Sequence, residues 1–240
     1  MRTKLLYQLD SYLKEFEATV LHKEGNKIIL DQTAFHPLAD GLDSDTGVFI
    51  TKSGETKVLE VIKDKNLGEI VHIVENPEII EEGETVKGFV DWERRYRMMR
   101  LHTAAHIVEA VLYNKYKVKI TGGHITPEYA KKDFDLSVPN WKEIIENAVE
   151  EANNIVNKEI EVKVYFLSRE EALNIPGIVK LATRLPPSVD KLRIVEIPGI
   201  DIQADGGPHV KNTKEIGKIK ILQIDNRGKH RRRLYFTVEP

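Results

Sequence analysis

Hydrophobic and polar residues alternate in short segments over the first 90 residues of the chain. These segments lie at residues 16–21, 27–30, 47–51, 57–63 and 68–74, and turn residues such as Glu24-Gly25-Asn26 and Asn76-Pro77 separate them. Short strands at this spacing are typical of a small barrel. We therefore predict an N-terminal β-barrel domain over residues 1–90, in which only residues 7–16 leave the choice between helix and strand open.

A helical period replaces this alternation after Asp91. Apolar residues recur every three or four positions from Met98 to Leu112, which predicts an amphipathic helix over residues 91–116. A second helix is predicted over residues 141–157 with Asn140 as its cap, and a short third one opens with a Ser168–Glu171 capping box. Strands are predicted at 162–167, 193–197, 217–225 and 232–238. The fold class is therefore α+β, with residues 91–240 forming a two-layer domain on a mostly antiparallel sheet.

The amino-acid composition limits which kinds of reactive or metal-binding site the protein can have. The 240 residues include no cysteine, so disulfides and thiolate chemistry are excluded and any metal ion must be held by His, Asp or Glu. No apolar run approaches the roughly 18 residues of a membrane span, and the first residues do not resemble a signal peptide, so we expect a cytoplasmic protein without a membrane partner. Because the net charge is −2, any contact with RNA must come from local basic segments, which lie at residues 92–97 and 227–233. The same segments are equally compatible with a role in solubility.

His102 and His106 stand four residues apart in the first predicted helix, so both imidazoles lie on one helix face. Two such rings can close on one tetrahedral metal ion, but they are also compatible with histidines placed by chance. Thr103 occupies the position where the zinc peptidase motif needs a glutamate base, which argues against a peptidase of that class.

Asp205 and His209 flank a Gly-Gly-Pro turn far downstream. Glycine and proline allow such a turn to bring two side chains to one side, although a surface loop between strands is the simpler interpretation of this segment alone. With the helix pair, the set becomes three imidazoles and one carboxylate, a workable donor set for zinc.

These segments together resemble the editing domains of alanyl-tRNA synthetases and the free-standing AlaX proteins. The resemblance rests on the two metal motifs, 102–106 and 205–217, and on the stretches 30–37, 44–47, 91–92 and 133–135 with Asn153, in the family's order. It implies a medium-length, free-standing protein with a barrel domain in front of a zinc-binding editing domain.

The resemblance also implies the activity: ATP-independent hydrolysis of the ester of tRNA(Ala) mischarged with serine or glycine, in the service of translation fidelity. Zn²⁺ would be held by His102, His106, Asp205 and His209. Thr33 would recognise the serine hydroxyl, unless it is an ordinary strand threonine, and Gln203 would orient the substrate or a metal ligand. Two other functions are open: a non-catalytic tRNA-binding module with a structural zinc, and a deacylase for another aminoacyl-tRNA such as threonyl-tRNA.

The chain departs from the family pattern at three places. Asp205 replaces the usual cysteine, so the site has a harder ligand, or only three histidines and water as ligands. Pro208 replaces a threonine. Ala39-Asp40-Gly41-Leu42 stands where the family has a Gly-Gly-Gly-Gln stretch, which bears on the choice of amino acid.

Overall fold

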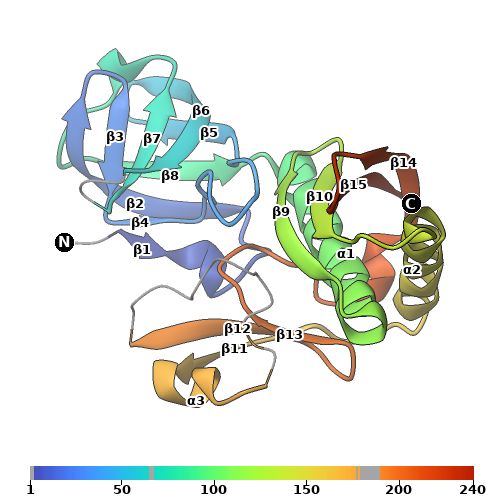
Figure 1. Cartoon of the computed structure of the whole chain (residues 1–240). Helices are drawn as coiled ribbons and strands as arrows, with labels where there is room; N and C mark the ends of the chain where they lie inside the picture. Colours follow the sequence, from blue (N-terminus) through green and yellow to red (C-terminus); the bar gives the residue numbers. More distant parts are fainter. Residues whose placement is uncertain (1–2, 65–67, 177, 179–189) are drawn as a thin grey trace. The chain divides into compact units, whose positions relative to one another are not determined.

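The computed structural model describes residues 3–64, 68–176, 178 and 190–240, and over these the chain has an α+β fold (Figure 1). Backbone contacts divide the chain into two units, Met1–Arg97 and Met98–Pro240. This division falls within helix α1 (Trp92–Tyr116), and the domain boundary between residues 90 and 91 stays a prediction. None of the helices in the described ranges is long and apolar enough to cross a membrane.

The first unit contains a closed antiparallel β-barrel, which confirms the predicted small barrel. The strands follow one another around it in the order β2 (Glu15–Glu24), β3 (Lys27–Leu30), β7 (Ile70–Val74), β6 (Gly54–Lys63), β5 (Gly47–Thr51) and β8 (Thr85–Val90). Outside the barrel, β1 (Lys4–Leu5) and β4 (Gln32–Thr33) form a parallel pair. The 3-10 turns of this unit are η1 (Leu6–Gln8), which occupies part of the ambiguous segment 7–16, and η2 (Pro77–Ile79).

Strand β8 closes the barrel, although its sequence pattern did not predict a strand. Its buried positions are Val86, Gly88 and Val90, so a glycine stands where the alternation requires an apolar side chain. A Cβ atom at Gly88 would lie 2.4 Å from the ring of Phe16, which is therefore the group that fills this part of the core. Because Gly88 has no side chain, the sequence pattern of a strand is interrupted there, and the same absence makes room for the ring of Phe16.

His72 is a fully buried polar residue in the apolar barrel core. Its Nδ1 lies 3.1 Å from the carbonyl oxygen of Ile28, which can only accept, so Nδ1 carries the proton. The bare Nε2 then accepts from the hydroxyl of Thr33 (2.9 Å), and that hydroxyl oxygen accepts from the amide of Phe35 (3.1 Å). Burial lowers the pKa of His72 to about 4, so the ring is neutral at neutral pH.

Arg95 ties the segment after β4 to the beginning of α1. Its guanidinium is fully buried, pairs with the carboxylate of Asp45, and donates to the carbonyl oxygens of Ser11 (3.1 Å) and Ala34 (2.6 Å). A buried ion pair is retained at low cost only when its remaining hydrogen-bonding groups are satisfied, as they are here. The opening motif of the resemblance is thus held by a residue of the helix that follows it.

The second unit contains two antiparallel sheets in its described part, where we expected one. The larger has the strand order β14 (Lys218–Asn226), β15 (Arg231–Glu239), β10 (Ala130–Asp135) and β9 (Lys119–Ile125), and the smaller β11 (Lys163–Ser168), β12 (Lys191–Ile197) and β13 (Asp201–Ala204). Helix α2 (Trp141–Val156) packs against β14, while α3 (Arg169–Leu173) and η3 (Thr213–Ile216) are short. The two-layer arrangement stays a prediction.

Three helical predictions can be compared with the structure. The Ser168–Glu171 capping box is confirmed in both of its hydrogen bonds. Asn140 stands at the N-cap position of α2, as predicted, but its side chain makes no capping hydrogen bond. Helix α1 is confirmed, but not as an amphipathic helix: every residue from 101 to 112 is buried. Its polar side chains therefore need partners inside the protein.

We expect His72 to make the stability of the chain depend on pH. Its pKa is about 4 in the folded chain and 6.5 when unperturbed, so the unfolded chain binds the proton first as the pH falls. The stability due to neutral His72 is complete above pH 6.5 and is lost between pH 6.5 and 4, by up to about 3 kcal/mol. In urea titrations at pH 7 and 4.5, His72→Gln should lose less stability on acidification than the wild-type chain.

The matched control is His230→Gln, which removes an exposed imidazole and should leave the wild-type pH dependence unchanged. Identical pH dependence in the His72→Gln and wild-type proteins would contradict the assignment.

Candidate metal centre

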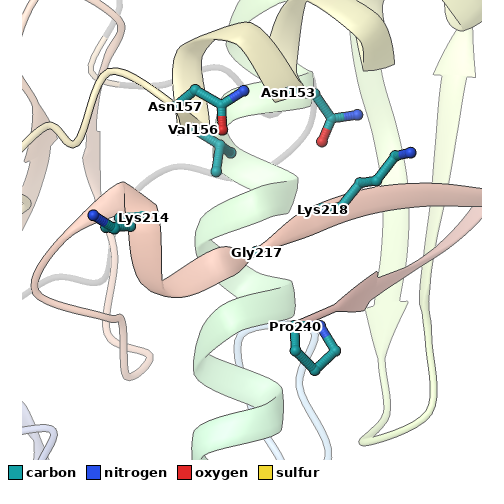
Figure 2. Close-up of a pocket in the computed structure, with 7 residues that line it drawn as sticks. All are labelled: Asn153, Val156, Asn157, Lys214, Gly217, Lys218 and Pro240. Atoms are coloured by element: carbon teal, nitrogen blue, oxygen red, sulfur yellow. The ribbon is translucent and has the colours of Figure 1, made fainter.

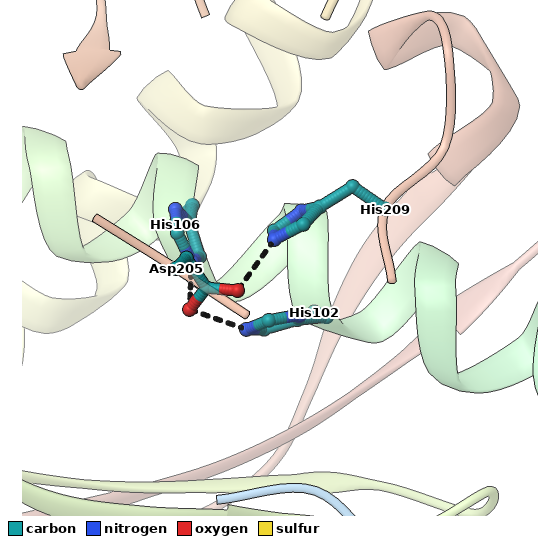
Figure 3. Close-up of side chains that lie close together, drawn as sticks. All are labelled: His102, His106, Asp205 and His209. Carbon is teal, nitrogen blue, oxygen red and sulfur yellow. Dashed lines mark hydrogen bonds and ion pairs between the residues drawn. The ribbon is translucent and has the colours of Figure 1, made fainter. Parts of the chain in front are cut away.

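Four predicted residues meet at one point in the second unit (Figure 3). His102 and His106 lie one turn apart on α1, Asp205 directly follows β13, and His209 follows the Gly206-Gly207-Pro208 turn. One ligand atom from each of the four lies within 4.8 Å of the others, and three of the residues are buried. The sequence prediction that these distant segments come together is therefore correct.

The distances within this cluster match those between the ligands of a tetrahedral ion. The Asp205 carboxylate lies 3.6 Å from Nε2 of both His102 and His106, and 3.3 Å from Nε2 of His209. Ligands bound at about 2.1 Å in a tetrahedron are about 3.4 Å apart. The distances from the two Asp205 oxygens to the three rings are therefore close to those expected around a small divalent ion.

Thr103 sets the orientation of the His209 ring. Its hydroxyl donates to the carbonyl oxygen of Met99 one turn earlier (3.0 Å), so its oxygen can only accept from Nδ1 of His209 (3.1 Å). Nδ1 of His209 must therefore carry the proton, which leaves the Nε2 lone pair directed at Asp205. Two acceptors that face one another at 3.3 Å have no hydrogen to share, and a cation between them satisfies both.

The two helix histidines are oriented in the same way. His102 directs Nδ1 at the carbonyl oxygen of Pro208 (3.3 Å), and His106 directs Nδ1 at the carboxylate of Asp201 (3.0 Å). Asp201 also accepts from the amide of Gln203 (3.0 Å), so Gln203 acts on His106 through Asp201. In all three rings Nδ1 is engaged outside the cluster and Nε2 points into it, the arrangement that outer hydrogen bonds impose on metal-binding histidines.

The electrostatics favour the protonation state that a metal ion requires. Burial, reinforced by the nearby His209, holds the pKa of His102 well below its usual value, and burial lowers the pKa of His209 to about 4. Burial alone would raise the pKa of Asp205, but the facing imidazoles outweigh it and the pKa lies well below its usual range. At neutral pH His102 and His209 are therefore neutral and Asp205 is ionised, the states in which these groups bind a metal ion.

Arg193 and Gly207 hold the loop that carries Asp205. The buried guanidinium of Arg193 donates to the carbonyl oxygens of Asp205 (3.0 Å) and Gly207 (2.8 Å). The Gly207 amide donates to the Asp205 carboxylate (2.7 Å), and a Cβ atom there would lie 2.7 Å from the ring of His102. Sequence analysis missed Arg193, Thr103 and Asp201, although the spacing of Asp201, Gln203 and Asp205 is that of one face of a strand.

Thr33 lies in the first unit, where it is fully buried and bonded to His72. Its proposed role in recognising serine therefore stays a prediction. The Ala39-Asp40-Gly41-Leu42 stretch is a tight turn closed by the Leu42 amide on the Ala39 carbonyl (2.8 Å), with both central residues at positive φ. An Asp-Gly pair is well suited to such a turn.

A cavity of about 340 Å³ lies elsewhere in the second unit (Figure 2). Its lining residues, none of which belongs to the cluster, are Asn153, Val156, Asn157, Lys214, Gly217, Lys218 and Pro240. The side-chain amide of Asn153 donates to the carbonyl oxygen of Ile219 (3.0 Å), and its oxygen accepts from the backbone N–H of Ile219 (2.8 Å). Asn153, part of the family resemblance, therefore joins α2 to β14.

Two family models match parts of the chain. The model described as the threonyl and alanyl tRNA synthetase second additional domain matches residues 192–235, and that of class II (A) tRNA synthetases matches residues 4–94. The first range includes Asp205 and His209.

Similar proteins extend over nearly the whole chain. The alanyl-tRNA editing protein AlaX-M of Saccharolobus solfataricus is 56% identical over 99% of this chain and 100% of its own length. The AlaX-M protein of Methanosarcina barkeri is 38% identical over 98% of this chain and 99% of its own. The alanine–tRNA ligase of Ignicoccus hospitalis is 35% identical over 92% of this chain, which corresponds to 24% of the ligase.

We expect Asp201→Asn to weaken binding of a divalent transition-metal ion by about 10- to 100-fold, because an amide holds the His106 ring less firmly than a carboxylate does. Competition with a chromophoric chelator measures this affinity directly. Asp135→Asn removes an exposed carboxylate of the same unit and should bind the ion as the wild type does. Unchanged affinity in Asp201→Asn would show that the Asp201–His106 contact does not support the site.

Proposed function

The chain belongs to the AlaX-M family of alanyl-tRNA editing proteins, and from this premise we propose that it removes serine or glycine from mischarged tRNA(Ala) in the cytoplasm. The observation that carries the proposal is the end-to-end similarity to a protein of that name, at 56% identity. The proposed reaction is the hydrolysis of the ester between the amino acid and the terminal ribose.

The need for such a reaction follows from the limits of binding. A synthetase pocket for alanine excludes larger side chains, but it cannot strongly reject glycine, which is smaller, or serine, which adds one hydroxyl group. A second, hydrolytic site must therefore remove the errors. Because the ester is already activated, its hydrolysis consumes no ATP and requires mainly that the ester and a water molecule be correctly positioned.

We assign Zn²⁺ to the cluster, with His102, His106, Asp205 and His209 as its ligands. The donor set of three imidazoles and a carboxylate, and the distances from Asp205 to the rings, support this assignment. A bound zinc ion supplies a Lewis acid that polarises a carbonyl group or activates water. The chain itself keeps the three Nε2 atoms convergent through Thr103, Asp201 and the Pro208 carbonyl.

Asp205 is the ligand best suited to leave room for a substrate. Its carboxylate has two oxygens, one near His209 and one near the helix pair, and it is the least buried member of the cluster. Asp205 would hold a metal ion through one or both of its oxygens, whereas a thiolate offers a single donor atom. The four-ligand set thus remains compatible with catalysis.

Thr33 is the proposed recognition residue for serine. The proton of its hydroxyl is committed to His72, so toward a ligand the oxygen can only accept a hydrogen bond. A serine side chain offers a donor to such an oxygen, whereas alanine and glycine do not, so this contact would account for the removal of serine and not for that of glycine. Gln203 is proposed to position His106 through Asp201.

We expect the purified protein to deacylate seryl-tRNA(Ala) and glycyl-tRNA(Ala) much faster than alanyl-tRNA(Ala). His102→Ala should lower the rate by more than about 100-fold, because it removes a ligand rather than an outer contact. His22→Ala, which removes a surface histidine, is the matched control and should keep the wild-type rate. Absence of hydrolysis of all three esters by folded wild-type protein would refute the proposed function.

Metal removal distinguishes an enzyme from a non-catalytic tRNA-binding module with a structural zinc. We expect a chelator to abolish deacylation while the circular dichroism spectrum and tRNA binding persist, with activity restored by zinc, because the barrel and the small sheet have hydrophobic cores of their own. Loss of the folded signal together with the metal ion would instead favour the structural role, which the full set of four protein ligands is also able to serve.

A further inference from the structure

The small sheet β11–β12–β13 has two different faces. On one face Tyr165, Ile194 and Ala204 lie opposite one another across the three strands, and they pack in an apolar cluster with Ala172 of α3. This face is an ordinary hydrophobic core. The other face carries Arg193, Asp201 and Gln203, which contact the Asp205 loop or the His106 ring or one another.

The register places two rows of side chains on that second face. In one row Phe166 pairs with Arg193, whose carbonyl oxygen accepts from the Asp205 amide (3.1 Å). In the other row Val164 pairs with Val195, and Val195 pairs with Gln203. Residues opposite one another in antiparallel strands point to the same side. Phe166 therefore stands on the same face as the metal ligand Asp205, with β12 between them.

Phe166 and Val164 are unusually accessible for apolar residues. Their side chains are 42% and 41% exposed, whereas Arg193 and Val195 beside them on β12 are buried. Lys191 follows on the same face, paired with Ser168, and is exposed as well. The face thus ends at its outer edge in an exposed aromatic ring with an aliphatic neighbour and a cation nearby.

We propose that Phe166, supported by Val164, stacks against the 3′-terminal base of the RNA whose ester lies at the metal centre, with Lys191 beside the adjoining phosphate. The inference rests on the proposed function, because it takes the ester to be the group bound at the cluster. Neighbouring strands lie about 4.8 Å apart, so β11 is about 10 Å from β13. In an aminoacylated nucleotide one ribose separates the ester from the base. The distance between ester and base is therefore of the same order as the distance between β13 and β11.

The occupant fits a base better than a second protein chain. A stable protein interface buries on the order of 1,600 Å² in total, far more than two partly exposed side chains supply. One aromatic ring is sufficient to bind a base, because stacking needs only a flat apolar surface. The phosphate next to that base needs a nearby positive charge. The aromatic ring and Lys191 provide both.

The test uses the full-length protein and an RNA acceptor-stem minihelix that ends in 2-aminopurine, whose fluorescence is quenched when the base stacks. Wild-type protein and Phe166→Trp should quench it, whereas Phe166→Ala should abolish the quenching and lower the affinity by about tenfold. Leu222→Ala removes a leucine of β14 that is 53% exposed and should behave as wild type. In deacylation, Phe166→Ala should raise KM with little change in kcat.

The outcomes separate this inference from the proposed function. Quenching that depends on Phe166 supports the stacking, even if wild-type protein hydrolyses no ester and the proposed function fails. Deacylation by the wild type with quenching unchanged in Phe166→Ala overturns the stacking and leaves the function intact. A change of elution volume caused by Phe166→Ala in RNA-free gel filtration also overturns it, because the face would then join copies of this chain.

Discussion

The hydrogen bonds on the outer nitrogens of His102, His106 and His209 are the interactions on which the rest of the site depends. Each engages Nδ1 with an acceptor that has no proton to give, namely a backbone carbonyl, a carboxylate, or a hydroxyl already committed elsewhere. The three Nε2 lone pairs consequently converge on a carboxylate, an arrangement that is unfavourable without a cation. The orientation of the rings, more than their number, makes the cluster suited to hold a metal ion.

This constraint explains why the surrounding structure is so polar within a buried region. Helix α1 is buried on all sides along residues 101–112, so each polar group on it needs a partner inside the protein. Thr103 is bonded to Met99 and His209, and Glu109 forms an ion pair with Lys132 at 2.8 Å. The loop that carries Asp205 also has polar groups that need partners, and Arg193 donates hydrogen bonds to two of its carbonyl oxygens. Packing of the second unit therefore also sets the positions of the residues around the site.

Residue types and local periods predicted much of this structure, and long-range pairing accounts for most of what they missed. The four cluster residues and helices α1 and α2 follow from spacing, because local sequence decides them. Strand β8 was hidden by Gly88, whose missing side chain makes room for Phe16, and β13 was hidden because its alternating residues Asp201 and Gln203 are polar. Thr103, Asp201 and Arg193 gain their roles only from partners about 100 residues or a whole strand away. No local pattern marks Thr103 or Arg193, and only the alternation with Gln203 and Asp205 marks Asp201.

The cysteine-free ligand set has a consequence for the conditions under which the centre can work. A zinc-bound thiolate can be oxidised by peroxide through sulfenic to sulfinic acid, and the oxidised sulfur is lost as a thiolate ligand. Asp205 and the three histidines are outside this pathway, and the chain contains no cysteine that could form a disulfide with another protein. During oxidative stress, when thiol-dependent enzymes lose activity, this donor set remains chemically unchanged and requires no reductant to restore it.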